Sequence, residues 1–125
     1  TGWIFNRLSK CILDVNNKWF KFDISGFSDN LQFTHYKAPQ GKYKKHVDKR
    51  YNKVIRKLSF SVQLSDSKDY KGGNLVLFDG SKGTVLSKTK GSLFCFPSYT
   101  LHEVTKVSRG ERNSLVGWIT GKNFR

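Results

Sequence analysis

Residues 56–65, RKLSFSVQLS, alternate apolar and polar side chains with a period of two. The apolar positions are Leu58, Phe60, Val62 and Leu64. Successive side chains of a β-strand point to opposite faces, so this pattern is typical of a strand with one apolar and one polar face. We expect the apolar face to pack under an N-terminal helix and the polar face to line the interior of a barrel.

Short strands of this kind dominate the chain, separated by turn signals that include Ser25-Gly26, Gly83 and Gly110. The predicted strands cover residues 20–24, 31–37, 43–48, 56–65, 74–79, 92–96, 102–107 and 112–120. About eight short strands with turns between them predict a mainly β fold, an antiparallel sandwich or barrel of which the jelly roll is one form.

One helix precedes the strands. Apolar residues recur there at intervals of three and four, as on the buried face of an amphipathic helix. They are Ile4, Phe5, Leu8, Cys11, Ile12 and Val15. Asn16 and Asn17 interrupt the pattern and end the predicted helix.

The composition describes a small, basic, aromatic-rich chain. Its 125 residues suffice for one domain, and 23 Lys and Arg against 9 Asp and Glu give a net charge of +14. Aromatic residues make up 14% of the chain, which argues against disorder. No apolar run approaches the roughly 20 residues of a membrane span, and no signal peptide is evident. We expect a soluble cytoplasmic protein in which Cys11 and Cys95 are reduced and mostly buried.

Three residues predict a metal site. His46 and Asp48 are two positions apart, so a strand would place them on the same face. His102, at the start of a later predicted strand, would complete a set of two imidazoles and one carboxylate. That set leaves metal positions open and is the ligand arrangement of non-haem Fe(II) oxygenases.

A second cluster predicts a carboxylate-binding site. Strand alternation places Arg112, Ser114 and Trp118 on one face of residues 112–120, with Leu115 and Ile119 on the other. A guanidinium with a hydroxyl two residues further on suits a bidentate clamp on a carboxylate.

These motifs, in their order, carry a family resemblance. Residues 36–48 contain the spacing Tyr-x(6)-Tyr-x-x-His-x-Asp at Tyr36, Tyr43, His46 and Asp48. A second motif consists of residues 56–66 followed by Tyr70 and Gly72-Gly73. A third begins at His102 and Val104 and continues with Val107, Gly110 and Arg112. Over residues 19–125 the chain resembles the 2-oxoglutarate and Fe(II)-dependent dioxygenases of the prolyl 4-hydroxylase type, in their bacterial and phage branch.

The resemblance implies a fold and a domain organisation. The fold is a double-stranded β-helix, a cupin-like jelly roll, with a supporting N-terminal α-helix. Residues 1–125 would form a single Fe(II)/2-oxoglutarate dioxygenase domain, with residues 1–18 as helical support and 19–125 as the jelly-roll core. The helical support is short and the chain begins at Thr1 without a methionine, so we expect an N-terminal portion to be missing.

The resemblance also assigns roles to residues. His46, Asp48 and His102 would bind Fe(II), and Arg112 and Ser114 would hold the C5 carboxylate of 2-oxoglutarate. Tyr36 would contact the same cosubstrate, and Trp118 would line the pocket floor. Some relatives carry a cosubstrate-binding tyrosine where this chain has Gln63, for which we expect a changed contact. O2 is the second cosubstrate, and the resemblance leaves room for ascorbate; no general base or nucleophile is assigned.

The activity implied is hydroxylation of a prolyl residue in a peptide or protein, with release of succinate and CO2. Nine basic residues lie within residues 37–57, where Asp48 is the only acid. Of these, Lys44, Lys45, Lys49 and Arg50 would flank the metal and dock an acidic partner, such as a protein of the translation apparatus, or nucleic acid. The other reading of the basic run is a solvated surface.

Three other functions stay open at this point. An oxidative demethylase of nucleic acid would use the same metal centre, with the basic run on the phosphate backbone. A zinc hydrolase would use the same triad without needing Arg112 and Ser114. A non-catalytic nucleic-acid-binding barrel would stack bases on exposed aromatic residues. Its candidate platforms are Trp3, Trp19, Tyr36, Tyr43 and Tyr51.

Overall fold

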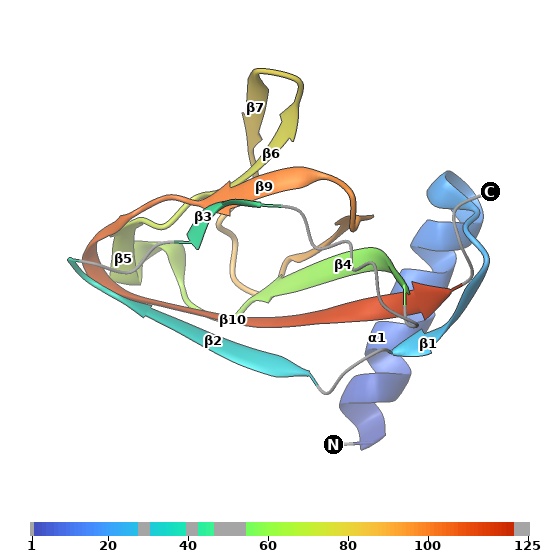
Figure 1. Cartoon of the computed structure of the whole chain (residues 1–125). Coiled ribbons are helices and arrows are strands. Elements are labelled where there is room, and N and C mark those ends of the chain that lie inside the picture. Colours follow the sequence, from blue (N-terminus) through green and yellow to red (C-terminus); the bar gives the residue numbers. More distant parts are fainter. Residues whose placement is uncertain (1, 28–30, 40–42, 47–54, 122–125) are drawn as a thin grey trace.

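The computed structural model describes residues 2–27, 31–39, 43–46 and 55–121. These form a helix, a π-helical turn, a short 3-10 helix and two antiparallel sheets (Figure 1). The helical elements are α1 (Gly2–Val15), η1 (Asn16–Phe20) and η2 (Ser67–Asp69). The strands are β1 (Ile24–Phe27), β2 (Gln32–Lys37), β3 (Tyr43–His46), β4 (Ile55–Gln63), β5 (Tyr70–Gly72), β6 (Leu75–Asp79), β7 (Lys82–Val85), β8 (Leu93–Pro97), β9 (Leu101–Val104) and β10 (Val107–Gly121).

The two sheets confirm the predicted jelly-roll fold. The larger has the order β1-β10-β4-β8, and β2 and β5 pair with other parts of the long strand β10. The smaller has the order β3-β9-β6-β7, and its β6–β7 hairpin projects from the body of the molecule (Figure 1). All described strand pairs are antiparallel.

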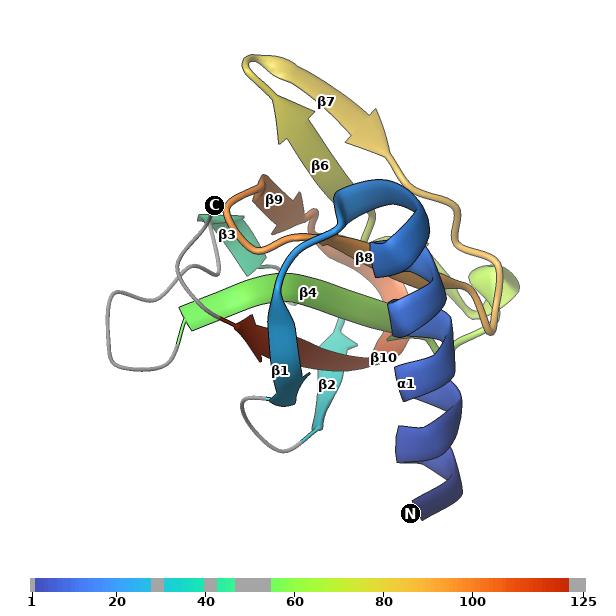
Figure 2. The same ribbon diagram turned by 90° about the vertical axis from the view of Figure 1, so that its right-hand side faces the viewer.

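The helix α1 packs beside β4 and β10, as the alternation in residues 56–65 predicts (Figure 2). Leu8 and Ile12 on the helix meet Leu58, Phe60 and Ile119 in one buried cluster. The apolar face of the large sheet is thereby covered at its helix end. The cluster fixes which face of β4 and β10 remains for the interior between the sheets.

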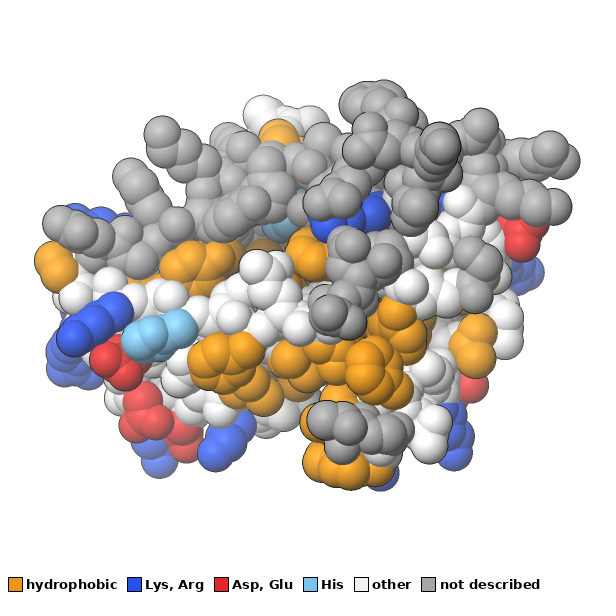
Figure 3. Space-filling view, turned by 60° about the horizontal axis from the view of Figure 1, so that its bottom comes forward, with side chains coloured by type: hydrophobic (Ala, Val, Ile, Leu, Met, Phe, Trp, Pro, Cys, Tyr) orange, Lys and Arg blue, Asp and Glu red, His pale blue; other side chains and the backbone are white. Residues whose placement is uncertain are grey.

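Farther along the same outer face, β2 and β10 are not covered by the helix. Phe33 lies opposite Leu115 in the strand pair and is 62% exposed. Figure 3 shows the apolar side chains of this side of the molecule. The next residue on each strand, Thr34 on β2 and Ser114 on β10, points the other way, into the interior.

The segment predicted as a strand at residues 20–24 is instead the corner between helix and sheet. The Asn16 side chain accepts a hydrogen bond from the Phe22 N–H and donates one to the Phe22 carbonyl, both 2.9 Å long. Lys21 adopts a left-handed conformation, with φ of 53°, and its N–H donates to the Asn16 carbonyl. These bonds hold the corner, so the strand begins at Ile24 and Ser25-Gly26 lies inside it.

Three further sequence expectations were wrong. Gly110 does not end a strand but lies within β10, paired with Tyr70 of β5, where a Cβ atom would lie 2.0 Å from the Asp69 carbonyl oxygen. Gly83 lies within β7, and β5 and β7 were not predicted, because three- and four-residue strands carry little alternation. Cys11 is exposed at the flank of the helix stripe.

The second thiol behaves differently from the first. Cys95 packs partly buried against the apolar cluster. Burial raises the pKa of the Cys95 thiol to about 12. Both cysteines are free, as the sequence predicts.

No helix in the described ranges has the length and apolar character that a membrane crossing requires.

We expect Ile12→Ala to lower the free energy of unfolding by about 2–5 kcal/mol, because it opens a cavity between α1 and the sheet. Leu13→Ala on the same helix is the control, since Leu13 is 47% exposed, and it should cost less than about 1 kcal/mol. Urea denaturation followed by circular dichroism measures both. Equal losses would mean that the helix does not dock through its Ile12 face.

Candidate active site

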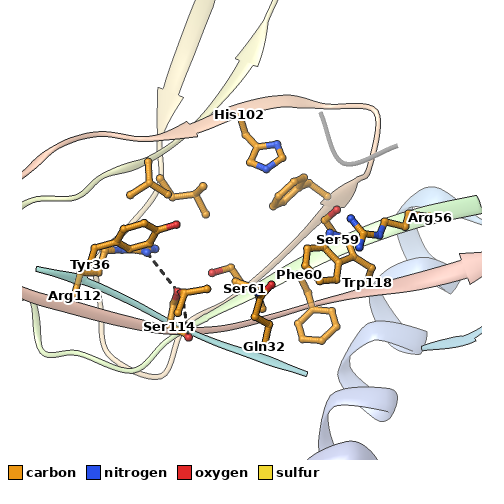
Figure 4. A pocket seen from close by; sticks show the side chains of 15 residues that line it. Gln32, Tyr36, Arg56, Ser59, Phe60, Ser61, His102, Arg112, Ser114 and Trp118 are labelled. Carbon is orange, nitrogen blue, oxygen red and sulfur yellow. Dashed lines mark hydrogen bonds between the residues drawn. The ribbon is translucent and has the colours of Figure 1, made fainter. Parts of the chain in front are cut away.

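A cavity of about 320 Å³ lies between the two sheets (Figure 4). The polar face of the large sheet supplies its hydroxyl groups, and the small sheet supplies His102 and apolar residues. Four serine and threonine side chains line it: Thr34, Ser59, Ser61 and Ser114. Two arginines, Arg56 and Arg112, also reach its wall.

Arg112 lies at one end of this cavity and is only 2% exposed. Its Nη2 donates to the Gln63 Oε1 at 2.8 Å, and its Nη1 donates to the Ser114 Oγ at 3.3 Å. The Tyr36 ring lies 5.7 Å from the centre of the guanidinium. All of these partners are neutral.

The charge of Arg112 therefore has no carboxylate partner among the described residues, whose one ion pair joins His35 and Glu111. Its Nε is buried and has no hydrogen-bond partner. Burial lowers the pKa of Arg112, and the nearby hydroxyls of Tyr70 and Tyr36 partly oppose that shift. A guanidinium stays charged in proteins, and a buried charge without a partner is unfavourable. The cavity end is thus complementary to an anion.

Ser114 sits beside Arg112 because of the strand register. It lies opposite Thr34 on β2 and opposite Gln63 on β4. Its hydroxyl is hydrogen-bonded to the Thr34 hydroxyl, and Ser114 is 1% exposed. Three neighbouring strands therefore bring Thr34, Ser114 and Gln63 together around the arginine.

Trp118, two strand repeats beyond Ser114, lines the other end of the cavity (Figure 4). The prediction that Arg112, Ser114 and Trp118 share the inward face of one strand is confirmed. The Arg56 guanidinium stacks 3.8 Å from the centre of the Trp118 ring. Figure 4 shows this pair at the far side of the pocket from Arg112.

Sequence reasoning missed Arg56, which it counted only as part of the basic run. Alternation with Leu58 would place Arg56 on the apolar face. The register of β4 against β10 shifts between Ile119 and Thr120, so that Leu58 faces Ile119 but Arg56 faces Thr120. Lys57 is the extra residue of this irregularity, which turns Arg56 to the cavity side. The available sequence signal was an arginine at the start of a strand whose inward positions are small polar residues.

Gln63 is buried but is not among the residues that line the cavity. Its side-chain oxygen accepts from Arg112, and its Nε2 donates to the Tyr70 hydroxyl at 2.9 Å. The expected direct contact with a cosubstrate stays a prediction, and the geometry favours a role through Arg112.

His102 lines the cavity from β9 and is 6% exposed. Its Nδ1 lies 2.9 Å from the Thr100 carbonyl, and its ring packs against Phe96. A carbonyl at Nδ1 favours the tautomer with the proton on that nitrogen, which leaves the ring's lone pair on Nε2. The backbone of His46 pairs directly with that of His102 across β3 and β9.

The rest of the predicted metal site is outside what the structure describes. Asp48, Lys49 and Arg50 lie outside the described residues, and of His46, Lys44 and Lys45 only the backbone is described. Among the described side chains no group of three potential ligands gathers. The described donor set nevertheless fits a metal and a dicarboxylate, with an imidazole at one wall and a buried cation and hydroxyls at the other.

Comparison with known proteins identifies the family. The profile of the 2OG-Fe(II) oxygenase superfamily matches residues 31–120, and the chain belongs to that superfamily. Fe(II), 2-oxoglutarate and O2 are the metal and cosubstrates of the family.

Particular relatives narrow the comparison. A PKHD-type hydroxylase of Prochlorococcus marinus is 36% identical over 94 residues, which are 74% of this chain and 39% of the relative. The chain thus spans about two fifths of that relative's length.

Among solved structures, a prolyl-4-hydroxylase of Pseudomonas putida superposes with a TM-score of 0.74 at 26% identity. The match covers 95% of this chain and 65% of that one. A prolyl hydroxylase of Trichoplax adhaerens, in complex with a hypoxia inducible factor peptide fragment, shares the fold with a TM-score of 0.79 at 20% identity. That match covers 96% of this chain and 56% of the other.

Because the Arg112 charge has no carboxylate partner among the described residues, 2-oxoglutarate should raise the melting temperature of the wild type. At a concentration 100 times the Kd, the gain is about 2.7 kcal/mol, which corresponds to several degrees. Arg112→Ala should lose this rise, whereas Arg109→Ala, an exposed arginine on the same strand, should keep it. Differential scanning fluorimetry measures the shifts. An undiminished rise in Arg112→Ala would place the anion elsewhere.

Proposed function

We propose that residues 1–125 form one Fe(II)- and 2-oxoglutarate-dependent dioxygenase domain that hydroxylates a prolyl residue in a peptide or protein. The observation that carries the proposal is the buried Arg112, whose charge has no carboxylate partner among the described residues and faces a cavity with His102 in its wall. Residues 1–18 serve as helical support. A cytoplasmic location is part of this proposal and is compatible with two free thiols.

His46, Asp48 and His102 would hold Fe(II). The backbone pairing of His46 with His102 supports a shared site, and the Thr100 carbonyl supports ligation through the His102 Nε2. The chemistry that the metal supplies when bound is oxidation of 2-oxoglutarate by O2 to succinate and CO2, with the second oxygen atom inserted into a substrate C–H bond. We assign no general base, because this chemistry needs none.

The described residues of the chain would bind and orient 2-oxoglutarate. Arg112 and Ser114 donate to the C5 carboxylate of 2-oxoglutarate, and the Tyr36 ring packs beside the guanidinium. The apolar wall formed by Phe96, Leu75 and Val104 keeps water from the space next to His102. Such orientation and exclusion of water are what the protein adds to the cosubstrate's own chemistry. Ascorbate stays a prediction.

The Arg56–Trp118 pair supports a prolyl substrate. The stacked guanidinium holds the indole in place, so the ring offers a rigid apolar wall for a pyrrolidine. A prolyl residue has no backbone N–H, so burying it leaves only carbonyl acceptors to satisfy. An arginine is suited to donate to such a carbonyl. The names of the Pseudomonas putida and Trichoplax adhaerens proteins agree with this substrate class.

The described residues do not favour the non-catalytic nucleic-acid-binding alternative. Tyr36 lies in the cavity wall, and Trp3 and Trp19 lie near opposite ends of the helical segment, more than about 20 Å apart at 1.5 Å per residue. These three aromatic rings therefore do not form a single stacking platform. The docking role of Lys44, Lys45, Lys49 and Arg50 and a substrate from the translation apparatus stay predictions.

We expect the wild type, supplied with Fe(II), 2-oxoglutarate and proline-containing peptides, to release succinate and add one oxygen atom to a prolyl residue. His46→Ala and Asp48→Ala should each abolish iron binding and turnover. The matched control is Glu103→Gln, next to His102 on β9, which should keep both. Metal analysis, succinate release and peptide mass spectrometry measure these outcomes. Turnover retained in either alanine variant would remove that residue from the metal site.

Arg56→Met should raise the peptide KM by about tenfold or more, because a hydrogen bond from a charged donor contributes roughly 1.5–3 kcal/mol. Turnover of 2-oxoglutarate without peptide should change little, since Arg56 lies at the opposite end of the cavity from Arg112. Arg109→Ala again serves as the control. A raised 2-oxoglutarate KM with an unchanged peptide KM would contradict this assignment.

A further inference from the structure

Arg112 is oriented by a chain of neutral groups behind the cavity wall. Its Nη2 donates to the Gln63 Oε1 at 2.8 Å, and the other end of that amide donates to the Tyr70 hydroxyl at 2.9 Å. Gln63 is 3% exposed and Tyr70 is 2% exposed. Both atoms of the amide are therefore used inside the protein.

Gln63 is also fixed through its backbone. Its N–H donates to the Ser92 carbonyl at 2.9 Å, and its carbonyl accepts from the Gly91 N–H at 2.7 Å. With both backbone and side-chain polar groups bonded, the amide has one orientation. The acceptor that it presents to Arg112 is therefore held in a fixed place.

Tyr70 is held in turn by its surroundings. The Lys88 ammonium lies 4.2 Å from the centre of the Tyr70 ring and donates to the Gly72 carbonyl at 2.8 Å. A Cβ atom at Gly73 would lie 2.9 Å from Val107, 3.1 Å from the Arg112 Cδ and 3.3 Å from the Tyr70 ring. Only glycine at position 73 lets the tyrosine and the arginine approach so closely.

The neutrality of this support matters for an anion. A guanidinium has five N–H donors, and Gln63 takes one without neutralising the charge. A carboxylate in the same place would form a buried ion pair with Arg112 and would compete with any incoming carboxylate. Removal of the amide would instead take away the acceptor that orients the Arg112 Nη2.

We propose that Gln63 and Tyr70 are positioning residues that aim the uncompensated Arg112 charge at the distal carboxylate of 2-oxoglutarate. The inference rests on the proposed function, since it assigns that carboxylate to Arg112. It replaces the direct contact expected of Gln63 with an indirect one. Neither residue touches the cosubstrate.

The test measures the selectivity of the Fe(II) protein, under anaerobic conditions, for 2-oxoglutarate over pyruvate. Pyruvate has the same keto acid end but lacks the distal carboxylate, so the ratio of the two Kd values reports the contribution of Arg112. Isothermal titration calorimetry gives both Kd values. A merely structural defect would weaken both ligands and leave the ratio unchanged.

We expect Gln63→Glu to lower the selectivity ratio by about tenfold or more, through competition of the introduced carboxylate for Arg112. Tyr70→Phe, which removes the acceptor for the Gln63 amide, should lower it by about three- to tenfold. The matched control is Gln32→Glu, which adds the same charge to the cavity wall from β2 and should lower the ratio by less than about threefold. If Gln63→Glu does not fold, Gln63→Met takes its place, with the same effect as Tyr70→Phe expected.

The outcomes separate this inference from the proposed function. If the wild type does not prefer 2-oxoglutarate over pyruvate, and is no more selective than Arg112→Ala, both the proposed function and the positioning role are overturned. A selective wild type whose ratio survives in the Gln63 variant and in Tyr70→Phe would overturn the positioning role alone. An equal loss in Gln32→Glu would also overturn it, because added charge would then explain the effect.

Discussion

The buried, uncompensated charge of Arg112 is the constraint on which the site depends. A guanidinium that is 2% exposed, with only neutral partners among the described residues, is unfavourable in the protein without a ligand. The Ser114 hydroxyl and the Gln63 amide accept hydrogen bonds from the guanidinium but do not neutralise its charge. In the proposed function, a bound carboxylate would supply a charged partner, and the cost of burying the charge would be recovered as affinity for the cosubstrate.

The fold places this charge through one long strand. β10 runs from Val107 to Gly121 and pairs with β1, β2, β4 and β5 along its length. Its inward side carries Arg112, Ser114 and Trp118, so this one strand spans the cavity from the end at Arg112 to the end at Arg56 (Figure 4). Its outward side packs Ile119 against α1. Stability and the site thus share one strand and use opposite faces of it.

Much of this arrangement follows from sequence patterns. A period of two is enough to assign the inward face of β10, and the stripe that includes Leu8 and Ile12 is enough to place the helix under the sheet. The residue types of His46, Asp48 and His102 together indicated His102 as a ligand candidate. The face of β10 and the helix stripe depend on local periodicity, which a sequence displays directly.

The remaining features depend on departures from periodicity. One extra residue at Lys57 turns Arg56 into the cavity, and the side chain of Asn16 converts an apparent strand into a corner. The Gln63 amide donates a hydrogen bond to the hydroxyl of Tyr70, seven residues away across a turn. No sequence pattern predicts that bond. Bulges and side-chain bonds of this kind arise from tertiary packing, so they become visible only in three dimensions.

The proposed function assigns the Arg112 charge to the distal carboxylate of 2-oxoglutarate. A crystal structure of the anaerobic Fe(II) protein with 2-oxoglutarate bound tests this assignment. We expect the distal carboxylate within hydrogen-bond distance of Arg112 and Ser114, with the Gln63 amide still hydrogen-bonded to Arg112 and Tyr70. A cosubstrate whose distal carboxylate binds away from Arg112, or an Arg112 paired with an acidic residue of the chain, would contradict it.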